Sequence, residues 1–159
     1  MTSNILDAPH LDLAGLSRVR AADPQAIGRC WQARARRPLL GADGRVLIVA
    51  ADHPARASLA VGGDAGAMAS RSDLLRRLAI ALANPHVDGV LATADILEDL
   101  LLLGLLEGRL AFGSMNRGGL RGASYELDDR FTGYTAEVIA AHRLDGGKML
   151  TRISLEDAG

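Results

Sequence analysis

The sequence predicts an α/β protein of about four successive parallel β/α units, preceded by an N-terminal helix. The first observation is a set of short, mainly apolar segments, 46–51, 87–92 and 109–113, that are too short to cross a membrane and that suit buried strands. The second is that each run ends abruptly in polar or ionisable side chains, and that a fourth segment, 146–153, carries Lys148. Because α/β folds build their sites at the carboxyl ends of parallel strands, these polar side chains are the first candidates for a functional site.

Length and composition restrict the class of protein. With 159 residues, 48% of them hydrophobic, the chain is long enough to bury a core and too apolar to be disordered. A net charge of −1 argues against a dedicated nucleic-acid-binding protein, and the single Cys30 fits a reducing compartment. The chain opens with no secretory leader, and its most apolar run, 100–106, is far shorter than the ~20 residues of a membrane span. We therefore expect a cytoplasmic protein that binds neither nucleic acid nor membrane.

Residues 1–40 are predicted to form an N-terminal helical extension, and residues 41–159 the β/α units. The pair Asp-Pro at 23–24 suits the N-cap and first position of a helix that would run to about Arg37. The last turn of this helix holds Arg34, Arg36 and Arg37. These cations are expected to complement the carboxyl end of the helix; the alternative is a patch that binds a polyanion.

The first unit starts with the run 46–51, which we expect to be buried on both faces, as a strand of a parallel sheet is. The Gly- and Ala-rich segment 54–69 has neither a helical nor a strand period and is predicted to be a long loop, a kind of segment that is often functional. Leucines at i+4 spacing then predict a helix over 71–83, which Asn84-Pro85 ends.

The second unit places Asp95 shortly after its strand. Asp95 lies three residues before Glu98, which is the spacing of a capping box, so its structural role would be to cap a helix that runs to Glu107. The functional alternative is that Asp95 belongs to the site at the carboxyl edge of the sheet.

The third unit contains a glycine-rich loop, 114–122, after the strand at 109–113. Backbone amides in such a loop could hold an anion, although loops of this composition are common. Thr135 is expected to cap a third helix that ends near His142, and a tight turn at 145–147 leads into the fourth strand.

Lys148, the only lysine of the chain, is the most informative single residue. Lysine is rare in strands and is almost never fully buried without a partner. Alternation places it on one face with Leu150 and Arg152, and if the other face meets the helices, Lys148 points to the interior side of the sheet. Partial loss of hydration there would lower a lysine pKa toward the range in which an amine acts as a nucleophile or transfers protons. The alternative is an edge lysine that reaches solvent.

Asp52 is the natural partner of Lys148, because two strands that end at the same edge can bring a carboxylate and an amine within hydrogen-bonding reach. The carboxylate could orient substrate hydroxyls or exchange protons, or it could instead cap a turn. His53 is expected to point away from Asp52 while the strand persists. The acidic doublets 98–99 and 128–129 are expected to be solvated, and the histidines have no metal-ligand spacing, so no metal is expected.

The motifs at the strand ends resemble a known family. Taken together, they are similar to the aldolase-like (β/α)₈ barrels of the deoxyribose-phosphate and tagatose-bisphosphate aldolase superfamily, and in particular to an actinobacterial (β/α)₈-fold branch. The resemblance runs from about residue 38 to 155. It rests on Ala-Ala-Asp-His-Pro-Ala-Arg (50–56), Asp-Gly-Val-Leu-Ala-Thr (88–93) with Asp-Ile-Leu-Glu-Asp (95–99), Gly-Ser-Met-Asn-Arg-Gly-Gly (113–119) and Asp-Gly-Gly-Lys-Met-Leu (145–150).

The resemblance implies a partial (β/α)₈ barrel and a metal-independent aldol cleavage or condensation of a small sugar or sugar phosphate through a lysine Schiff base, without a cofactor. Asp52 matches the acidic position of strand one, and Lys148 matches a lysine of strand four that lines the site; both are taken as catalytic. The residues expected to bind substrate are His53, Asp95, Ser114, Asn116 and Arg117.

The sequence also departs from the family. The lysine that forms the Schiff base generally lies on strand six, whereas this chain ends just after strand four, so residues 41–159 are expected to be the first half of a barrel. Half a barrel leaves open sheet edges, which favours a homo-oligomer or a longer native chain. The alternative function is a barrel that binds a sugar or phosphate without turnover, through Asn116, Arg117 and the glycine backbone at 118–119.

Overall fold

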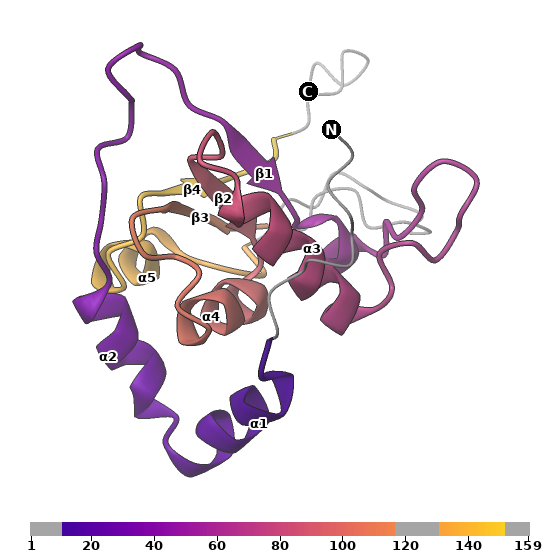
Figure 1. The fold of residues 1–159 in the computed structure, drawn as a ribbon, viewed down its shortest axis with the longest axis horizontal. Coiled ribbons are helices and arrows are strands. Elements are labelled where there is room, and N and C mark those ends of the chain that lie inside the picture. Colours follow the sequence, from indigo (N-terminus) through magenta and orange to yellow (C-terminus); the bar gives the residue numbers. More distant parts are fainter. Residues whose placement is uncertain (1–10, 117–130, 152–159) are drawn as a thin grey trace, which may run out of the picture.

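A computed structural model describes residues 11–116 and 131–151, and within them a parallel sheet is flanked by helices (Figure 1). The strands are β1 (Ile48–Ala50), β2 (Gly89–Ala92), β3 (Leu110–Ser114) and β4 (Gly146–Lys148). They lie side by side in chain order, and each neighbouring pair is parallel. The predicted α/β class with four parallel strands is therefore confirmed, although the strands at 46–51, 87–92 and 146–153 are shorter than expected.

Three helices follow the strands: α3 (Arg71–Ala83) after β1, α4 (Ala94–Leu102) after β2 and α5 (Ala136–Ala141) after β3. The bounds of α3 are those that the leucine spacing predicts. Thr135 caps α5, because its side chain accepts a hydrogen bond from the backbone N–H of Val138. By contrast, α4 ends five residues before Glu107, and turns complete the connection to β3.

The core lies between the sheet and these helices. Along the strands, Val90 and Ala111 are fully buried at the same register position and face the helices, with Val49 packed beside them. The helices contribute mainly leucines. The buried leucines of α3 and α4 are Leu75, Leu78, Leu82, Leu97, Leu100 and Leu101.

β1 is less buried than its apolar sequence predicts. Val46 and Leu47, just before the strand, are 40% and 53% exposed. Among the described residues β1 pairs only with β2, so it is an edge strand and burial on both faces was a wrong prediction. Its end continues into a 3₁₀ helix, η2 (His53–Arg56), at the start of the connection to α3.

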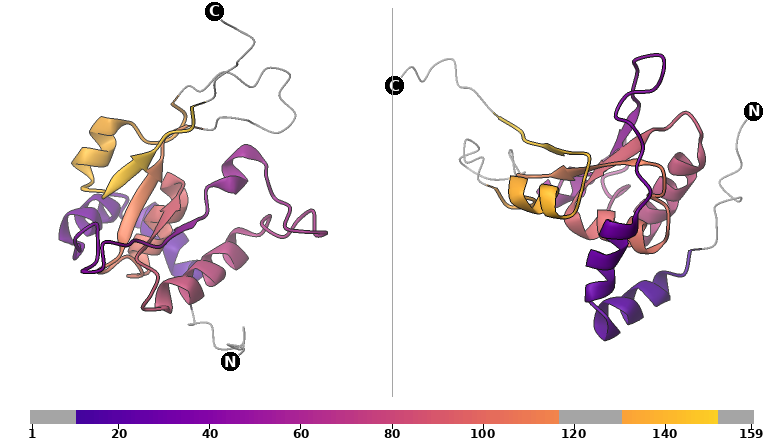
Figure 2. Two further views of the ribbon diagram at one scale, coloured as in Figure 1. Left: turned by 90° about the horizontal axis from the view of Figure 1, so that it is seen from above. Right: turned by 90° about the vertical axis from the view of Figure 1, so that its left-hand side faces the viewer.

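The N-terminal segment holds two helices, α1 (Leu13–Ala22) and α2 (Gln25–Ala33), where a single helix at 24–37 was predicted. Figure 2 shows both lying at the helix-covered side, with β4 and α5 at one end of the sheet and η2 and α3 at the other. No helix in the described ranges has both the length and the apolarity to cross a membrane.

The three arginines after α2 do not complement a helix terminus. Because α2 ends at Ala33, Arg34 and its neighbours lie in extended chain along the amino edge of the sheet. Arg34 and Arg36 both bind Asp145, which precedes β4, and Arg37 binds Asp88, which precedes β2. These arginines therefore fix the connection from α2 to the sheet, and the expectation that they lie in the last turn of a helix and complement its end is wrong. The alternative, a patch that binds a polyanion, stays a prediction.

Candidate functional site

The carboxyl edge of the sheet carries one layer of polar side chains. Ser114 and Lys148 are register partners in β3 and β4. Continuing the β1–β2–β3 register by two residues from Ala50 and Leu91 brings Asp52 and Thr93 to the same level. Since Val49, Val90 and Ala111 face the helices, alternation places this layer on the opposite face of the sheet.

Asp52 and Lys148 meet across the sheet. Lys148 Nζ lies 2.8 Å from Asp52 Oδ2, and the Ser114 hydroxyl donates to the same oxygen at 3.2 Å. Three strand spacings of a flat sheet would separate β1 from β4 by ~14 Å, and side chains stand roughly perpendicular to a sheet. The contact therefore requires the sheet to curl so that its two outer strands approach each other at this edge.

The Asp52 carboxyl of this pair rests in its ionised form. Burial of Asp52 raises its pKa, but the hydrogen bond and charge of Lys148, with the Ser114 hydroxyl, outweigh burial and hold that pKa below its ordinary value. The Asp52 side chain is only 9% exposed, whereas that of Lys148 is 32% exposed. A buried carboxylate thus faces an amine that a ligand can still reach from solvent.

His53 lies closer to this pair than the sequence predicts. Its Nδ1 is 3.8 Å from Asp52 Oδ1, because β1 ends at Ala50 and the backbone turns into η2 at His53. The expectation that His53 points away from Asp52 depended on a longer strand and is wrong. Asp52 precedes η2 but makes no side-chain cap bond there, so the turn-capping alternative is also excluded.

Asn116 fixes the chain beyond Lys148. Its amide donates to the Leu150 carbonyl at 2.8 Å and accepts from the Leu150 N–H at 2.9 Å. Asn116 is buried, and it lines a cavity of about 300 Å³ together with Ser114, Thr93 and Asp95. The residue therefore holds the end of β4 in place and also borders the space above the polar layer. Arg117, the last residue expected to bind substrate, lies outside the described residues.

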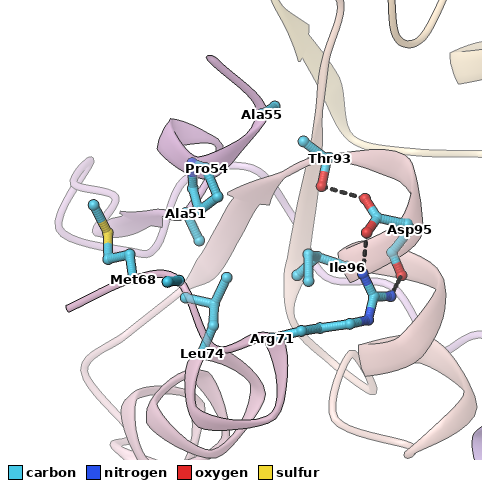
Figure 3. Close-up of a pocket in the computed structure, with 10 residues that line it drawn as sticks. Ala51, Pro54, Ala55, Met68, Arg71, Leu74, Thr93, Asp95 and Ile96 are labelled. Carbon is cyan, nitrogen blue, oxygen red and sulfur yellow. Dashed lines mark hydrogen bonds and ion pairs between the residues drawn. The ribbon is translucent and has the colours of Figure 1, made fainter. Parts of the chain in front are cut away.

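A second, larger cavity of about 390 Å³ lies between the ends of β1 and β2 (Figure 3). Its polar wall is formed by Arg71, Thr93 and Asp95. Thr93 Oγ1 donates to one oxygen of Asp95 at 2.5 Å, and the Arg71 guanidinium binds the other oxygen and, at 3.0 Å, the Asp95 backbone carbonyl. The remaining lining is apolar and comes from Ala51, Pro54, Ala55, Met68, Ala69, Leu74 and Ile96.

Asp95 does not cap α4, because Thr93 occupies the N-cap position. Burial raises the pKa of Asp95, but the hydrogen bonds from Thr93 and Arg71 outweigh burial and hold this pKa below its ordinary value. Arg71 was missed by the sequence analysis. One signal could have found it, since a cation at the first residue of a helix opposes the helix dipole and needs another partner.

The doublet Glu98-Asp99 is not solvated as predicted. Asp99 is only 4% exposed and lies between two arginines, Arg20 of α1 at 2.8 Å and Arg71 of α3 at 2.5 Å. Arg20 also binds Glu98 at 2.7 Å. The Arg71 guanidinium is therefore bound both by Asp99, which does not line the cavity, and by Asp95, which does. The other doublet, Asp128-Asp129, lies outside the described residues.

No group of three or more histidine, cysteine or carboxylate side chains that could hold a metal ion occurs in residues 11–116 and 131–151. The site is built instead from an amine, carboxylates, hydroxyls and one guanidinium. Such groups can move protons, form an imine and bind hydroxyl or carbonyl oxygens.

Comparison with known proteins relates the chain to one family and one solved structure. A family model described as Cgl0159-like matches residues 44–159. The crystal structure of Cgl0159 from Corynebacterium glutamicum (Brevibacterium flavum) is similar to this chain with 54% sequence identity and a TM-score of 0.86. The similarity covers 91% of this chain and 49% of that one, so the chain spans about half the length of its relative. A search of curated proteins gave no match.

Proposed function

This chain belongs to the Cgl0159-like family, and we propose that the polar layer at its carboxyl edge is part of an aldolase-like site. The substrate would be a small sugar or sugar phosphate with a carbonyl group, cleaved or condensed through a lysine Schiff base. One observation carries the proposal: the only lysine of the chain is held against a buried carboxylate at the edge of the sheet where α/β proteins build their sites.

In the proposed reaction Asp52 first takes a proton from the Lys148 ammonium, which lies 2.8 Å away. The neutral amine adds to the substrate carbonyl carbon, and one proton passes from its nitrogen to the carbonyl oxygen. Asp52 returns the other proton to this oxygen, which leaves as water, so that an iminium forms. Asp52 then accepts the proton of the hydroxyl on the β-carbon. The bond between the α- and β-carbons breaks, and its electron pair enters the iminium. Asp52 then gives its proton to the carbon of the resulting enamine, and water hydrolyses the iminium that forms.

We further propose that the sheet is half of an eight-stranded barrel. The strands are parallel and in chain order, and the contact between Asp52 and Lys148 requires a curled sheet. A similar protein is about twice as long, and the similarity covers 49% of it. The intact mass and the solution mass of the native protein test this idea. A dimer of 16.7 kDa chains or a chain of about twice that mass supports a closed barrel, whereas a 16.7 kDa monomer contradicts it.

The alternative is a protein of this fold that binds a sugar or phosphate without turnover. One observation favours it, because Asp52 holds the Lys148 amine at 2.8 Å, and the amine would have to leave this ion pair before it could attack a carbonyl carbon. The amine would then act as a fixed hydrogen-bond donor to a ligand oxygen.

Reductive trapping separates the two functions. The protein at its native length is mixed with small aldehydes, ketones and their phosphates, reduced with borohydride, digested and analysed by mass spectrometry. We expect an adduct on the peptide that contains Lys148 and none on that peptide in the Lys148→Arg variant, which keeps the charge.

An adduct on another amine of the native protein would keep the lyase and change the role of Lys148 to that of a proton donor. No adduct with any carbonyl compound would reject the Schiff base. Calorimetric binding of a sugar without product formation would then support the alternative.

A further inference from the structure

The cavity of about 390 Å³ beside the polar layer is built like a small-molecule site. Small-molecule pockets measure ~300–1,000 Å³ and have mostly apolar walls with a few converging polar groups. Here seven of the ten lining residues are apolar, and Figure 3 shows Arg71, Thr93 and Asp95 converging on one wall, opposite Pro54 and Met68.

The cavity is continuous in its lining with the smaller cavity above the polar layer. Three residues, Ala55, Thr93 and Asp95, line both this cavity and the smaller one that Ser114 borders. The Ser114 hydroxyl is bound to Asp52, which holds Lys148. A substrate whose carbonyl carbon lies at Lys148 would therefore extend past Ser114 and Thr93 and place its far end in the larger cavity.

The charges around this cavity do not suit a phosphate. Arg71 is the one cation in the lining, and it is already bound by both Asp95 and Asp99. The network continues to Arg20 and Glu98, so that among the described residues two arginines face three carboxylates. A phosphate placed here would meet a net negative cluster and would have to displace Asp95 from its guanidinium.

A hydroxyl group suits the same wall. Asp95 is ionised and its side chain is 55% exposed, so it can accept a hydrogen bond from a ligand hydroxyl while it keeps those from Thr93 and Arg71. A hydrogen bond to an ionised acceptor is about twice as strong as a neutral one. The apolar remainder of the wall would pack against the carbon chain.

We propose that the cavity between the ends of β1 and β2 binds the uncharged, hydroxyl-bearing end of the substrate through Asp95, so that the end remote from Lys148 carries no phosphate. This inference rests on the proposed function for the position of the carbonyl group. The sequence allows either a sugar or a sugar phosphate as the substrate, and this inference favours the free sugar.

The test is the binding of D-xylulose and of D-xylulose 5-phosphate to the protein at its native length, measured by calorimetry. We expect the unphosphorylated sugar to bind about tenfold or more tightly than the phosphate ester. The Asp95→Asn variant should bind the free sugar about tenfold more weakly, since it loses a charge-assisted hydrogen bond. The same variant should reduce the preference for the free sugar over the phosphate ester, because it removes one negative charge from the cavity wall.

Asp73→Asn is the matched control, because Asp73 is an exposed carboxylate of α3 that pairs with Arg77 and lines neither cavity. It should leave both affinities unchanged. Circular dichroism confirms folding, and Thr93→Val provides a second variant of the same wall if Asp95→Asn does not fold.

Tighter binding of the phosphate ester, an Asp95→Asn variant with unchanged affinities, or binding of neither sugar by folded protein would each overturn the inference. Borohydride trapping on the same samples separates this result from the proposed function. A lysine adduct together with a preference for the phosphate ester rejects the inference and keeps the lyase. A preference for the free sugar without any adduct keeps the inference and rejects the lyase.

Discussion

The amino ends of the strands form one edge of the sheet and the carboxyl ends form another. Each of these two edges buries a carboxylate in an ion pair, but the groups around the two carboxylates differ. At the amino edge Asp145 accepts from Arg34 at 3.0 Å and from Arg36 at 2.9 Å, and its Oδ2 also accepts the backbone N–H of Ala111 in β3 at 2.9 Å. Its side chain is 5% exposed, and that of Arg34 is fully buried. Within residues 11–116 and 131–151, each partner of this carboxylate is thus a backbone group or a planar, permanently charged group.

At the carboxyl edge the partners of Asp52 can move or change their protonation. The carboxylate is bound by the flexible Lys148 amine and the Ser114 hydroxyl, with the His53 ring 3.8 Å away. Lysine, serine and histidine can all donate a proton to, or accept one from, a substrate, whereas arginine stays charged. The contrast indicates that the amino edge holds the fold together and that the carboxyl edge is available for chemistry.

The largest effect is expected at the amino edge. Arg34→Met should destabilise the protein by about 3 kcal/mol, because it leaves Asp145 with one arginine and removes the donors to the carbonyls of Arg109 and Arg143. Urea unfolding followed by circular dichroism measures this change. A loss below about 1 kcal/mol would show that the amino-edge network does not stabilise the fold.

The neighbouring arginine should matter less. Arg36 binds the other oxygen of Asp145 but is 41% exposed, so Arg36→Gln should cost about 1 kcal/mol or less. Added salt should reduce this cost, because exposed charges are screened. If the two variants were equally unstable at low and high salt, burial would not be what distinguishes the two arginines.

At the carboxyl edge we expect a small effect on stability and a large effect on function. Asp52→Asn should change the free energy of unfolding by no more than about 1 kcal/mol, since the amide still accepts from Lys148 and Ser114 and the cost of burying a charge disappears. The rate of borohydride-trapped adduct formation should fall at least about 100-fold. A strongly destabilised variant that still forms the adduct would mean that this pair is as structural as that of Asp145.

The sequence predicted those parts of the molecule that depend on neighbours in the chain. The leucine spacing of α3 and the Thr135 cap of α5 are local signals, and the structure has both. Asp52 and Lys148 were paired in the prediction because parallel strands end at one edge, and they lie 2.8 Å apart. Whether this pair is catalytic remains a prediction.

The remaining features depend on groups distant in the sequence, which a local pattern does not contain. Arg34 looked like a helix-terminal cation because Asp145, its partner, lies 111 residues later. Asp99 looked solvated because Arg20 and Arg71 come from two other helices. The register that places Thr93 beside Asp52 and Ser114 also follows only from strand pairing.

The smallest expected effect is on the pH dependence of stability, to which the Asp52 carboxyl should contribute in acid. Because the pKa of Asp52 in the folded protein lies below its ordinary value of 3.8, the unfolded chain binds this proton first as the pH falls. The stabilisation from Asp52 is therefore complete above pH 3.8 and is lost as the pH falls through the lower, folded pKa. Asp52→Asn has no such proton to bind, so its free energy of unfolding should fall less steeply below about pH 4 than that of the wild type. Urea unfolding of both proteins between pH 6 and pH 2.5 measures the two slopes, and equal slopes would mean that Lys148 does not hold the carboxylate in its ionised form.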